Sequence, residues 1–229
     1  MRFIGNKTNL LSDILKVIKD NCDGTEKVFC DIFSGTASVS RFFKNKYTII
    51  SNDLLYSSYI LQMGTIENDE IPTFDKIRKV LNIEDIYDYL ENTDISKENF
   101  NKFIYENYSP NDHCERMYLT PENALRIDFI RNKIENWKNK ELITTNEYCY
   151  LLASLIEGVP YVSNITGTYG AYLKQWDKRA FKKFEMIRLN VIDNKANNKC
   201  YNRDANELIK EISLENKIEN NKKELEIEI

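Results

Sequence analysis

The sequence predicts an α/β fold in which a long, mostly helical segment interrupts a parallel sheet. Three observations predict it. Apolar residues recur with helical spacing near the amino terminus, and two short apolar stretches, 27–33 and 47–50, have the character of buried strands. A far longer stretch of helical character then separates them from a last α/β-like stretch near 187–204. Helix, strand, turn, helix and strand, in that order, open a doubly wound sheet.

The opening elements follow from short-range patterns. A helix is predicted over about 8–21, where leucine and isoleucine recur on one face. The strand 27–33 (KVFCDIF) leads into a turn of small residues, and a helix over about 37–45 follows this turn. The second strand, 47–50 (YTII), ends at Ser51-Asn52-Asp53.

After residue 54 the pattern becomes helical. Residues 75–108 are acidic, aromatic and of helical character. Thr120 and Pro121 open a helix that runs to about residue 138, because threonine is a favoured N-cap and proline fits the first turn. Thr145 is expected to cap a helix over about 146–158. The predicted organisation is a first α/β part at 1–53, a mostly helical insertion at 54–185, a return to the α/β part at 186–212 and a charged tail at 213–229.

Composition excludes several classes of protein. Of the 229 residues, 42% are hydrophobic, which suffices for a packed core, but no apolar run approaches the roughly 20 residues that span a bilayer. The amino terminus lacks the features of a signal peptide. The five cysteines show no paired spacing, so we expect reduced thiols in a cytoplasmic protein without a membrane partner. With His113 as the one histidine and no Cys-x-x-Cys pair, no metal site is expected.

The turn after the first strand, DIFSGTASV at 31–39, has the position of a nucleotide-binding turn. A pyrophosphate needs several glycines so that backbone amides can approach it, and this turn has only Gly35. Asp31 adds a negative charge, which suits a ligand that has an amino group and no phosphate. These residues therefore favour S-adenosylmethionine over NAD.

An acidic residue ends the second strand. Asp53 follows Gly35 by about 18 residues and can accept hydrogen bonds from both ribose hydroxyls of a nucleotide held at the preceding turn. Helix capping by Asn52 or Asp53 is the structural alternative.

Basic residues are concentrated late in the chain. The net charge is −4, yet residues 174–188 contain six basic and two acidic residues, with Trp176, Phe181 and Phe184 among them. Such a segment suits a nucleic-acid backbone, and the alternative is an ordinary solvated surface. The acidic stretch 67–106 would then have to face away from the nucleic acid.

Four stretches, in order, resemble the Dam-like DNA adenine-N6 methyltransferases, which are restriction–modification enzymes whose cofactor motifs precede the catalytic motif. The stretches are RFIGNK at 2–7, DIFSGTASV at 31–39, SND at 51–53 and VPYVSNITGTYGAYLK at 159–174. Asn107-Tyr-Ser-Pro110 and Arg116-Met-Tyr118 are similar too. The resemblance covers almost all of 1–212. It implies a partial Rossmann-like, S-adenosylmethionine-dependent methyltransferase sheet with a mostly helical, inserted DNA-recognition region.

The resemblance also implies roles for individual residues. Those at the cofactor would be Phe3, Lys7, Asp31, Phe33, Ser34, Gly35, Thr36, Asp53 and Asp204. Phe3 and Lys7 would contact the methionine and sulfonium end, and Asp204 the adenine. Three of them have ordinary alternatives: core packing for Phe3, a surface charge for Lys7, and the N-cap of a helix over 205–212 for Asp204.

In the resembled family, the helical insertion helps to recognise double-stranded DNA. The segment 161–183 mixes aromatic, amide, hydroxyl and basic side chains that can contact phosphates and bases. The candidates for DNA contact are Tyr161, Asn164, Thr166, Tyr169, Lys174, Lys178, Arg179, Lys182 and Lys183.

One feature of that family is missing. Adenine-N6 methylation needs an (Asp/Asn)-Pro-Pro-(Tyr/Phe) loop, which holds the target amino group and stacks on the flipped base. The four prolines, at positions 72, 110, 121 and 160, are never adjacent, and 213–229 has no buried-strand pattern. No catalytic residue is therefore assigned. We expect a truncated or split methyltransferase that is inactive alone, with an unfinished sheet that pairs with a separate carboxyl-terminal half or self-associates.

Two other functions stay open. One is a non-catalytic protein that binds DNA or S-adenosylmethionine and derives from such an enzyme. The other is an NAD-dependent oxidoreductase, which the glycine pattern of the turn disfavours.

Overall fold

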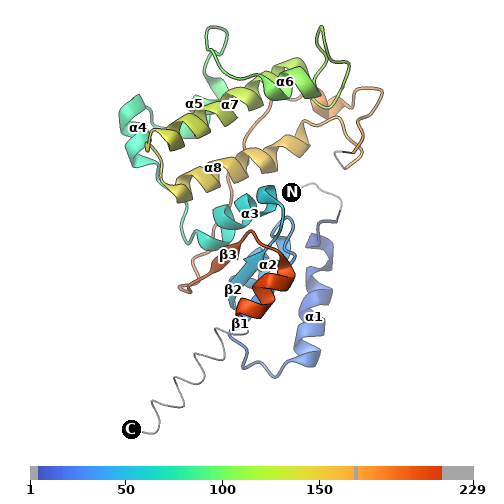
Figure 1. The fold of residues 1–229 in the computed structure, drawn as a ribbon, viewed down its shortest axis with the longest axis vertical. Helices are drawn as coiled ribbons and strands as arrows, with labels where there is room; N and C mark the ends of the chain where they lie inside the picture. The colour runs from blue at the N-terminus through green and yellow to red at the C-terminus, as the bar shows by residue number, and fades with distance from the viewer. Residues whose placement is uncertain (1–4, 168–169, 213–229) are drawn as a thin grey trace.

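A parallel sheet of three strands lies at one end of the described part of the molecule (Figure 1). The computed structural model describes residues 5–167 and 170–212. Strands β1 (Val28–Asp31), β2 (Thr48–Asn52) and β3 (Lys199–Tyr201) follow one another across the sheet in that order. Because all neighbours are parallel, the carboxyl ends of the strands meet at one edge. The strands predicted at 27–33 and 47–50 are confirmed, with slightly different ends.

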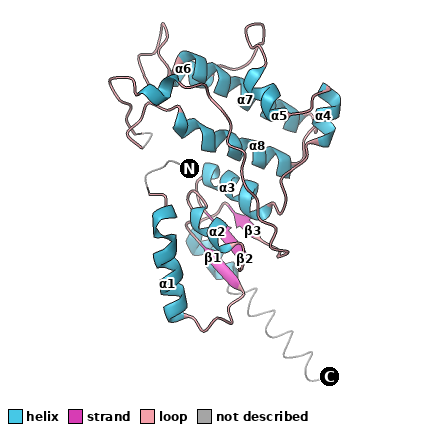
Figure 2. Ribbon diagram, turned by 180° about the vertical axis from the view of Figure 1, so that it is seen from behind, coloured by secondary structure: helices cyan, strands magenta, loops and turns pink. Residues whose placement is uncertain are grey.

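Helices cover the two faces of this sheet unequally. α2 (Ser38–Phe43) packs on one face, where Phe29 of β1 stacks on Phe43 with ring centroids 4.5 Å apart. Helix 205–212, also predicted, lies on the opposite face, as Figures 1 and 2 together show. α1 (Leu11–Asn21), which follows a 3₁₀ turn, flanks the sheet on the β1 side and has no fully buried residue.

The chain leaves β2 through a helix that the sequence pattern did not indicate. α3 (Tyr56–Gln62) continues into a π-helical turn, Met63–Glu67, which packs against α8 (Thr145–Gly158). Gly64 permits this contact, because a Cβ at that position would lie 2.9 Å from the Cβ of Ala153. The same turn also contacts α2 and β3. The predicted boundary at residue 54 therefore falls just before a segment that touches both the sheet and the helical region.

A buried lysine fastens this segment from the side of α2. The Lys44 ammonium, almost fully buried, donates to the carbonyl oxygens of Thr65 (3.4 Å) and Asn68 (2.5 Å). Burial lowers the pKa of Lys44, and the nearby Asp69 carboxylate opposes that shift. The ammonium thus connects the residue after α2 to carbonyl groups within and just after the π-helical turn.

The helical region is built on α7 (Pro121–Asn139) and α8, which run side by side (Figure 1). Three shorter helices flank them: α4 (Asp75–Leu81), α5 (Ile86–Asn92) and α6 (Phe103–Tyr108). The predicted helical stretch 75–108 is therefore divided. Asn82, with a φ of 52°, ends α4, and residues 93–102 form no helix.

The N-caps of the two long helices test the sequence rules directly. Thr120 caps α7 (Pro121–Asn139) as predicted, and its Oγ1 accepts from Asn123 N. The cap predicted for α8 was wrong by one residue, because Thr144 occupies that position in place of Thr145. Thr144 Oγ1 accepts from Glu147 N (3.1 Å), while Glu147 Oε2 accepts from Thr144 N (2.7 Å). Glu147 completes a capping box only with a threonine three residues before it.

The return to the sheet is shorter than the predicted 187–204. Only Lys199–Tyr201 form a strand. Upstream, Met186 N donates to Glu91 Oε1 (2.7 Å) and Leu189 O accepts from the Tyr150 hydroxyl (2.7 Å), so this segment is held by α5 and α8. The predicted tail 213–229 lies outside the described residues. None of the described helices combines the length and apolar character needed to cross a membrane. All five cysteines are free thiols.

Candidate functional site

The turn after β1 is fastened to the end of β2. Ser34 N donates to Asn52 O (2.9 Å), and Gly35 N donates to Asp53 Oδ2 (2.8 Å). Gly35 has a φ of 52°, in the left-handed region that glycine adopts at little cost. The other carboxylate oxygen of Asp53 accepts from Leu55 N (2.9 Å). Asp53 therefore joins the turn to the start of α3, which the spacing of the two motifs does not reveal.

Asn52 fastens the carboxyl ends of all three strands. Its buried amide donates to Ile32 O and Arg203 O, each at 3.1 Å, and accepts from Arg203 N at 3.1 Å. Sequence reasoning considered Asn52 only as part of a ribose-binding or capping pair. The available signal was its position directly after an apolar strand, where a buried amide can satisfy the ends of neighbouring strands.

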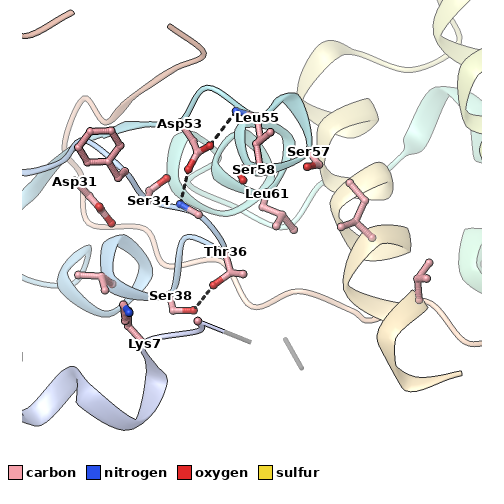
Figure 3. A pocket seen from close by; sticks show the side chains of 16 residues that line it. Lys7, Asp31, Ser34, Thr36, Ser38, Asp53, Leu55, Ser57, Ser58 and Leu61 are labelled. Carbon is pink, nitrogen blue, oxygen red and sulfur yellow. Dashed lines mark hydrogen bonds between the residues drawn. The ribbon is translucent and has the colours of Figure 1, made fainter. Parts of the chain in front are cut away.

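A cavity of about 530 Å³ opens beside this turn (Figure 3). Its walls come from the amino-terminal segment, the turn, α3 and the end of α8: Gly5, Lys7, Asp31, Phe33, Ser34, Gly35, Thr36, Ser38, Val39, Asp53, Leu55, Ser57, Ser58, Leu61, Ile156 and Val159. Seven of the nine predicted cofactor residues belong to this set: Lys7, Asp31, Phe33, Ser34, Gly35, Thr36 and Asp53. The structure thus brings residues of three separate sequence motifs to one cavity.

Asp31 and Ser34 give the cavity a polar side. Asp31 Oδ2 accepts from Ser40 Oγ (2.7 Å), and burial raises the pKa of the Asp31 carboxyl, with a smaller contribution from the Asp53 carboxylate. Ser34 Oγ is buried and has no hydrogen-bond partner among the described residues. A buried hydroxyl without a partner and the half-buried carboxyl of Asp31 fit a ligand that brings polar groups, one of them cationic.

The facing wall is apolar. Leu55 and Leu61 come from the start and body of α3, and Ile156 and Val159 come from the end of α8 and the residue after it. Sequence reasoning missed all four, because α8 lies far along the chain and only its packing against α3 brings it to the turn. Val159 lies in the quoted stretch 159–174, but nothing in that stretch indicates a cavity.

The amino-terminal candidates and Asp204 differ in position. Asn6 Oδ1 accepts from Ser38 Oγ (3.0 Å), which holds the segment of Lys7 against the start of α2 and beside the cavity. Phe3 lies outside the described residues. Asp204 does not line the cavity. Its exposed carboxylate accepts from Asn206 N (2.8 Å) and Glu207 N (3.3 Å), the geometry of an N-cap for helix 205–212. The capping alternative is supported, and contact with an adenine stays a prediction.

Two of the DNA candidates, Asn164 and Arg179, form hydrogen bonds to backbone groups of their own loop and its neighbours. Asn164 is fully buried and bonds three backbone groups at 2.9–3.0 Å. Arg179 donates through Nε to Ser163 O (3.0 Å) and through Nη2 to Ile165 O. Both side chains therefore fix the loop that Ile165 and Tyr172 close by a β-bridge. A direct contact of either with DNA stays a prediction that this arrangement does not favour.

Six other DNA candidates are exposed: Tyr161, Thr166, Lys174, Lys178, Lys182 and Lys183. The last two extend from a strip of backbone that α7 holds. Asn123 Nδ2 donates to Ala180 O and Lys182 O at 2.9 Å each, and Asn123 Oδ1 accepts from Phe184 N at 2.9 Å. This strip has a fixed course and presents lysines to solvent. Tyr169 lies outside the described residues.

No metal centre is indicated in the described ranges 5–167 and 170–212, where His, Cys, Asp and Glu side chains nowhere gather in threes. The lining residues of the cavity suit the binding and orientation of a polar, cationic ligand beside an apolar wall.

Comparison with known proteins identifies the family. Residues 3–215 match the D12 class N6 adenine-specific DNA methyltransferases. Over 93% of its length the chain is 52% identical to the Type II methyltransferase M.FokI of Planomicrobium okeanokoites and 45% identical to the modification methylase StsI of Streptococcus sanguinis. It is 36% identical, also over 93% of its length, to the Type II methyltransferase M.NlaIII of Neisseria lactamica.

The chain covers only part of these relatives. The matched part is 32% of M.FokI, 32% of StsI and 61% of M.NlaIII, so the chain spans about a third of the first two. No solved structure matches the chain significantly. Because the family match extends over almost the whole sequence, the chain belongs to the D12 class N6 adenine-specific DNA methyltransferases.

Proposed function

We propose that this chain is the S-adenosylmethionine-binding and DNA-contacting part of a site-specific DNA adenine-N6 methyltransferase. The observation that carries the proposal is the cavity at the carboxyl ends of β1 and β2, in which Asp31, the unpartnered hydroxyl of Ser34 and Asp53 face an apolar wall. Ligands of doubly wound sheets bind at this edge.

The residues of the cavity divide the work of binding. Asp31 accepts from the amino group of the methionine end and balances its positive charge. Asp53, fixed by Gly35 N and Leu55 N, accepts from the ribose hydroxyls with its remaining lone pairs. Leu55 and Leu61 offer apolar surface to the base and to the thioether chain. When bound, S-adenosylmethionine supplies the methyl group that the family transfers to adenine N6.

The sequence provides no loop with two adjacent prolines to hold the target amino group. We therefore propose that methyl transfer needs a second polypeptide segment that supplies this loop. A non-catalytic protein that binds S-adenosylmethionine or DNA is the alternative, and the same missing loop favours it. The two differ in whether a complement restores activity.

Calorimetric titration tests the cofactor assignment. Saturable binding of S-adenosylmethionine without binding of NAD supports it, whereas binding of NAD alone would favour the alternative of an NAD-dependent oxidoreductase.

The affinity for S-adenosylmethionine is expected to fall as the pH is lowered. The fall should begin at a higher pH than it would if Asp31 had the usual pKa of an aspartate. Burial raises the pKa of Asp31 above the usual 3.8, and only the ionised carboxylate pairs with the ligand's ammonium. Affinity should therefore be full above the raised pKa and fall as the pH decreases through it. Calorimetry at a series of pH values measures this. Asp31→Asn should bind weakly at every pH with a flat profile, while Asp204→Asn should keep the parent profile.

Charge reversal at Lys182 and Lys183 is expected to weaken the binding of duplex DNA at low salt and to flatten its salt dependence by roughly two phosphate contacts. Fluorescence anisotropy over a series of salt concentrations measures the slope. Lys97→Glu with Lys102→Glu is a matched control, because it makes the same change of charge at exposed positions of the acidic stretch. Equal slopes for the two double variants would favour the alternative that residues 174–188 are an ordinary solvated surface.

A further inference from the structure

We propose that a second cavity, enclosed by α3, α6, α7 and α8, binds a small apolar α-amino acid of the size of leucine. The cavity supplies aliphatic walls for the side chain of this ligand. Glu135 and Arg131 supply one charge each for its ammonium and its carboxylate. The inference rests on this cavity alone, and it depends neither on the proposed cofactor site nor on methyl transfer.

The second cavity has a volume of about 290 Å³ and lies among packed helices. Both ribbon views show α8 between α7 and α3 (Figures 1 and 2). Protein interiors leave few voids larger than a water molecule. An apolar cavity of about 150 Å³ already admits benzene, and sites for drug-sized ligands begin at about 300 Å³. The volume therefore suits a small molecule and is too small for a dinucleotide.

The walls of the second cavity are mainly aliphatic. Six of the side chains that form them are Ile127, Ile134, Leu152, Leu155, Ile156 and Val159. Such side chains offer favourable contact to a hydrocarbon chain and no hydrogen bond to a polar one. The part of a ligand that enters the cavity must therefore be apolar.

Two opposite charges of one helix line the same cavity. Arg131 and Glu135 of α7 are both exposed and stand four residues apart. Opposite charges at this spacing can pair, although the order of Arg before Glu is the less favourable one. Within the described part of the chain they form no ion pair with each other, and the Arg131 guanidinium has no hydrogen-bond partner. Both groups therefore have capacity for a ligand.

Tyr148 orients the acidic member of this pair. Its hydroxyl donates to Glu135 Oε2 (3.1 Å) from the opposite helix, α8. Burial raises the pKa of Tyr148, and the Glu135 carboxylate raises it further, so the hydroxyl stays a donor. One oxygen of Glu135 is thus engaged, and the other is left for a cationic group.

A zwitterion matches this arrangement better than a singly charged ligand. The carboxylate of an amino acid accepts from the forked donors of Arg131, and its ammonium donates to Glu135. A ligand with a carboxylate alone would bring a like charge to Glu135, and one with an ammonium alone would bring a like charge to Arg131. The charges and the aliphatic walls together indicate an α-amino acid with an apolar side chain.

The second cavity adjoins the first. Ser57, Ile156 and Val159 line both, so an occupant of the second would touch residues that also form the wall of the first. The acidic residues differ, because Asp31 lines the first cavity and Glu135 the second. This difference allows an experiment to tell the two sites apart.

The test titrates the full chain, without S-adenosylmethionine, with leucine and three matched probes in a calorimeter. 4-Methylpentanoate is leucine without the ammonium, 3-methylbutylamine is leucine without the carboxylate, and glycine is an amino acid without the apolar side chain. We expect saturable binding of leucine with one site per chain. Each of the three probes should bind at least tenfold more weakly, because each loses one of the three contacts.

Variants locate the site. Arg131→Gln and Glu135→Gln each remove one charge from an exposed side chain, so the fold is not at risk, and each should weaken leucine binding at least tenfold. In Arg131→Gln the advantage of leucine over 3-methylbutylamine should disappear, because these two probes differ only in the carboxylate. Glu84→Gln makes the same change as Glu135→Gln at an exposed position outside the cavity and should bind leucine like the parent.

Four outcomes would overturn the proposal. They are no saturable binding of leucine, equal binding of leucine and the singly charged probes, binding that tolerates both charge-removing variants, and loss of leucine binding in Asp31→Asn. The last would place leucine in the first cavity. Because S-adenosylmethionine is absent from these titrations, a failure of this proposal is distinguishable from a failure of the proposed cofactor site.

Discussion

Replacing Asp53 by alanine is expected to weaken S-adenosylmethionine binding ten- to a hundredfold. Hydrogen bonds to a charged group contribute about 1.5–3 kcal/mol each, and Asp53 is the carboxylate that we propose meets the ribose. The same side chain holds Gly35 N and Leu55 N, so its loss also loosens the turn that forms the cavity. Isothermal titration calorimetry on the parent and the variant measures the change.

Asp204→Ala is the matched control for this result. Asp204 lies at the end of the next strand but caps helix 205–212 and does not line the cavity. Its loss should cost about 1 kcal/mol of folding free energy and weaken the cofactor affinity less than the loss of Asp53 does. If the two variants both bind like the parent, the assignment of the cavity to the cofactor is wrong. If Asp204→Ala binds more weakly than Asp53→Ala, the predicted contact of Asp204 with adenine regains support.

The second large effect concerns catalysis. We expect that residues 1–229 alone transfer no methyl group to mixed-sequence duplex DNA, because no side chain in the sequence can hold the flipped adenine in the manner of a Pro-Pro-aromatic loop. Addition of the M.NlaIII part outside the matched segment should produce transfer, since positioning of the target nitrogen provides much of the rate. Incorporation of radiolabelled methyl groups measures both reactions.

Two controls interpret this assay. The added part alone should be inactive, and the mixture made with Asp53→Ala should be strongly impaired at limiting cofactor. Robust transfer by residues 1–229 alone would mean that the catalytic loop has been misassigned. A complex that forms but never transfers a methyl group would favour the alternative of a non-catalytic binding protein.

The local elements could be predicted because their signals are local. Thr120 and Pro121 mark the start of α7, and the apolar stretches 27–33 and 47–50 overlap two strands of the sheet. Either Thr144 or Thr145 could cap α8 by residue type. Glu147 decides between them, because its backbone N–H donates to Thr144 Oγ1. α3 was missed because its buried residues face the sheet on one side and α8 on another, which removes a simple periodicity.

The cavity could be predicted on one side only. Asp31, Gly35 and Asp53 lie in motifs whose chemistry is readable from the sequence. Ile156 and Val159 belong to the apolar wall for reasons that appear only when α8 packs on α3. Likewise, Asn164 has a side chain of the type that reads bases. In the structure it is buried and bonds three backbone groups, so it stabilises the loop. Residue type indicates a capability, and packing decides how it is used.

The end of α8 contacts α2, the cavity and the loop that contains the DNA candidates. Glu157 accepts from Arg41 of α2 (2.7 Å), Ile156 and Val159 form cavity wall, and Val159 O accepts from Ser163 Oγ (2.7 Å) at the root of the loop with the DNA candidates. If this helix end couples the two sites, thermodynamic linkage requires the coupling free energy to be the same whichever ligand binds first. Whatever factor DNA applies to cofactor affinity, the cofactor must apply to DNA affinity. One titration with and without the other ligand therefore measures both halves of the cycle.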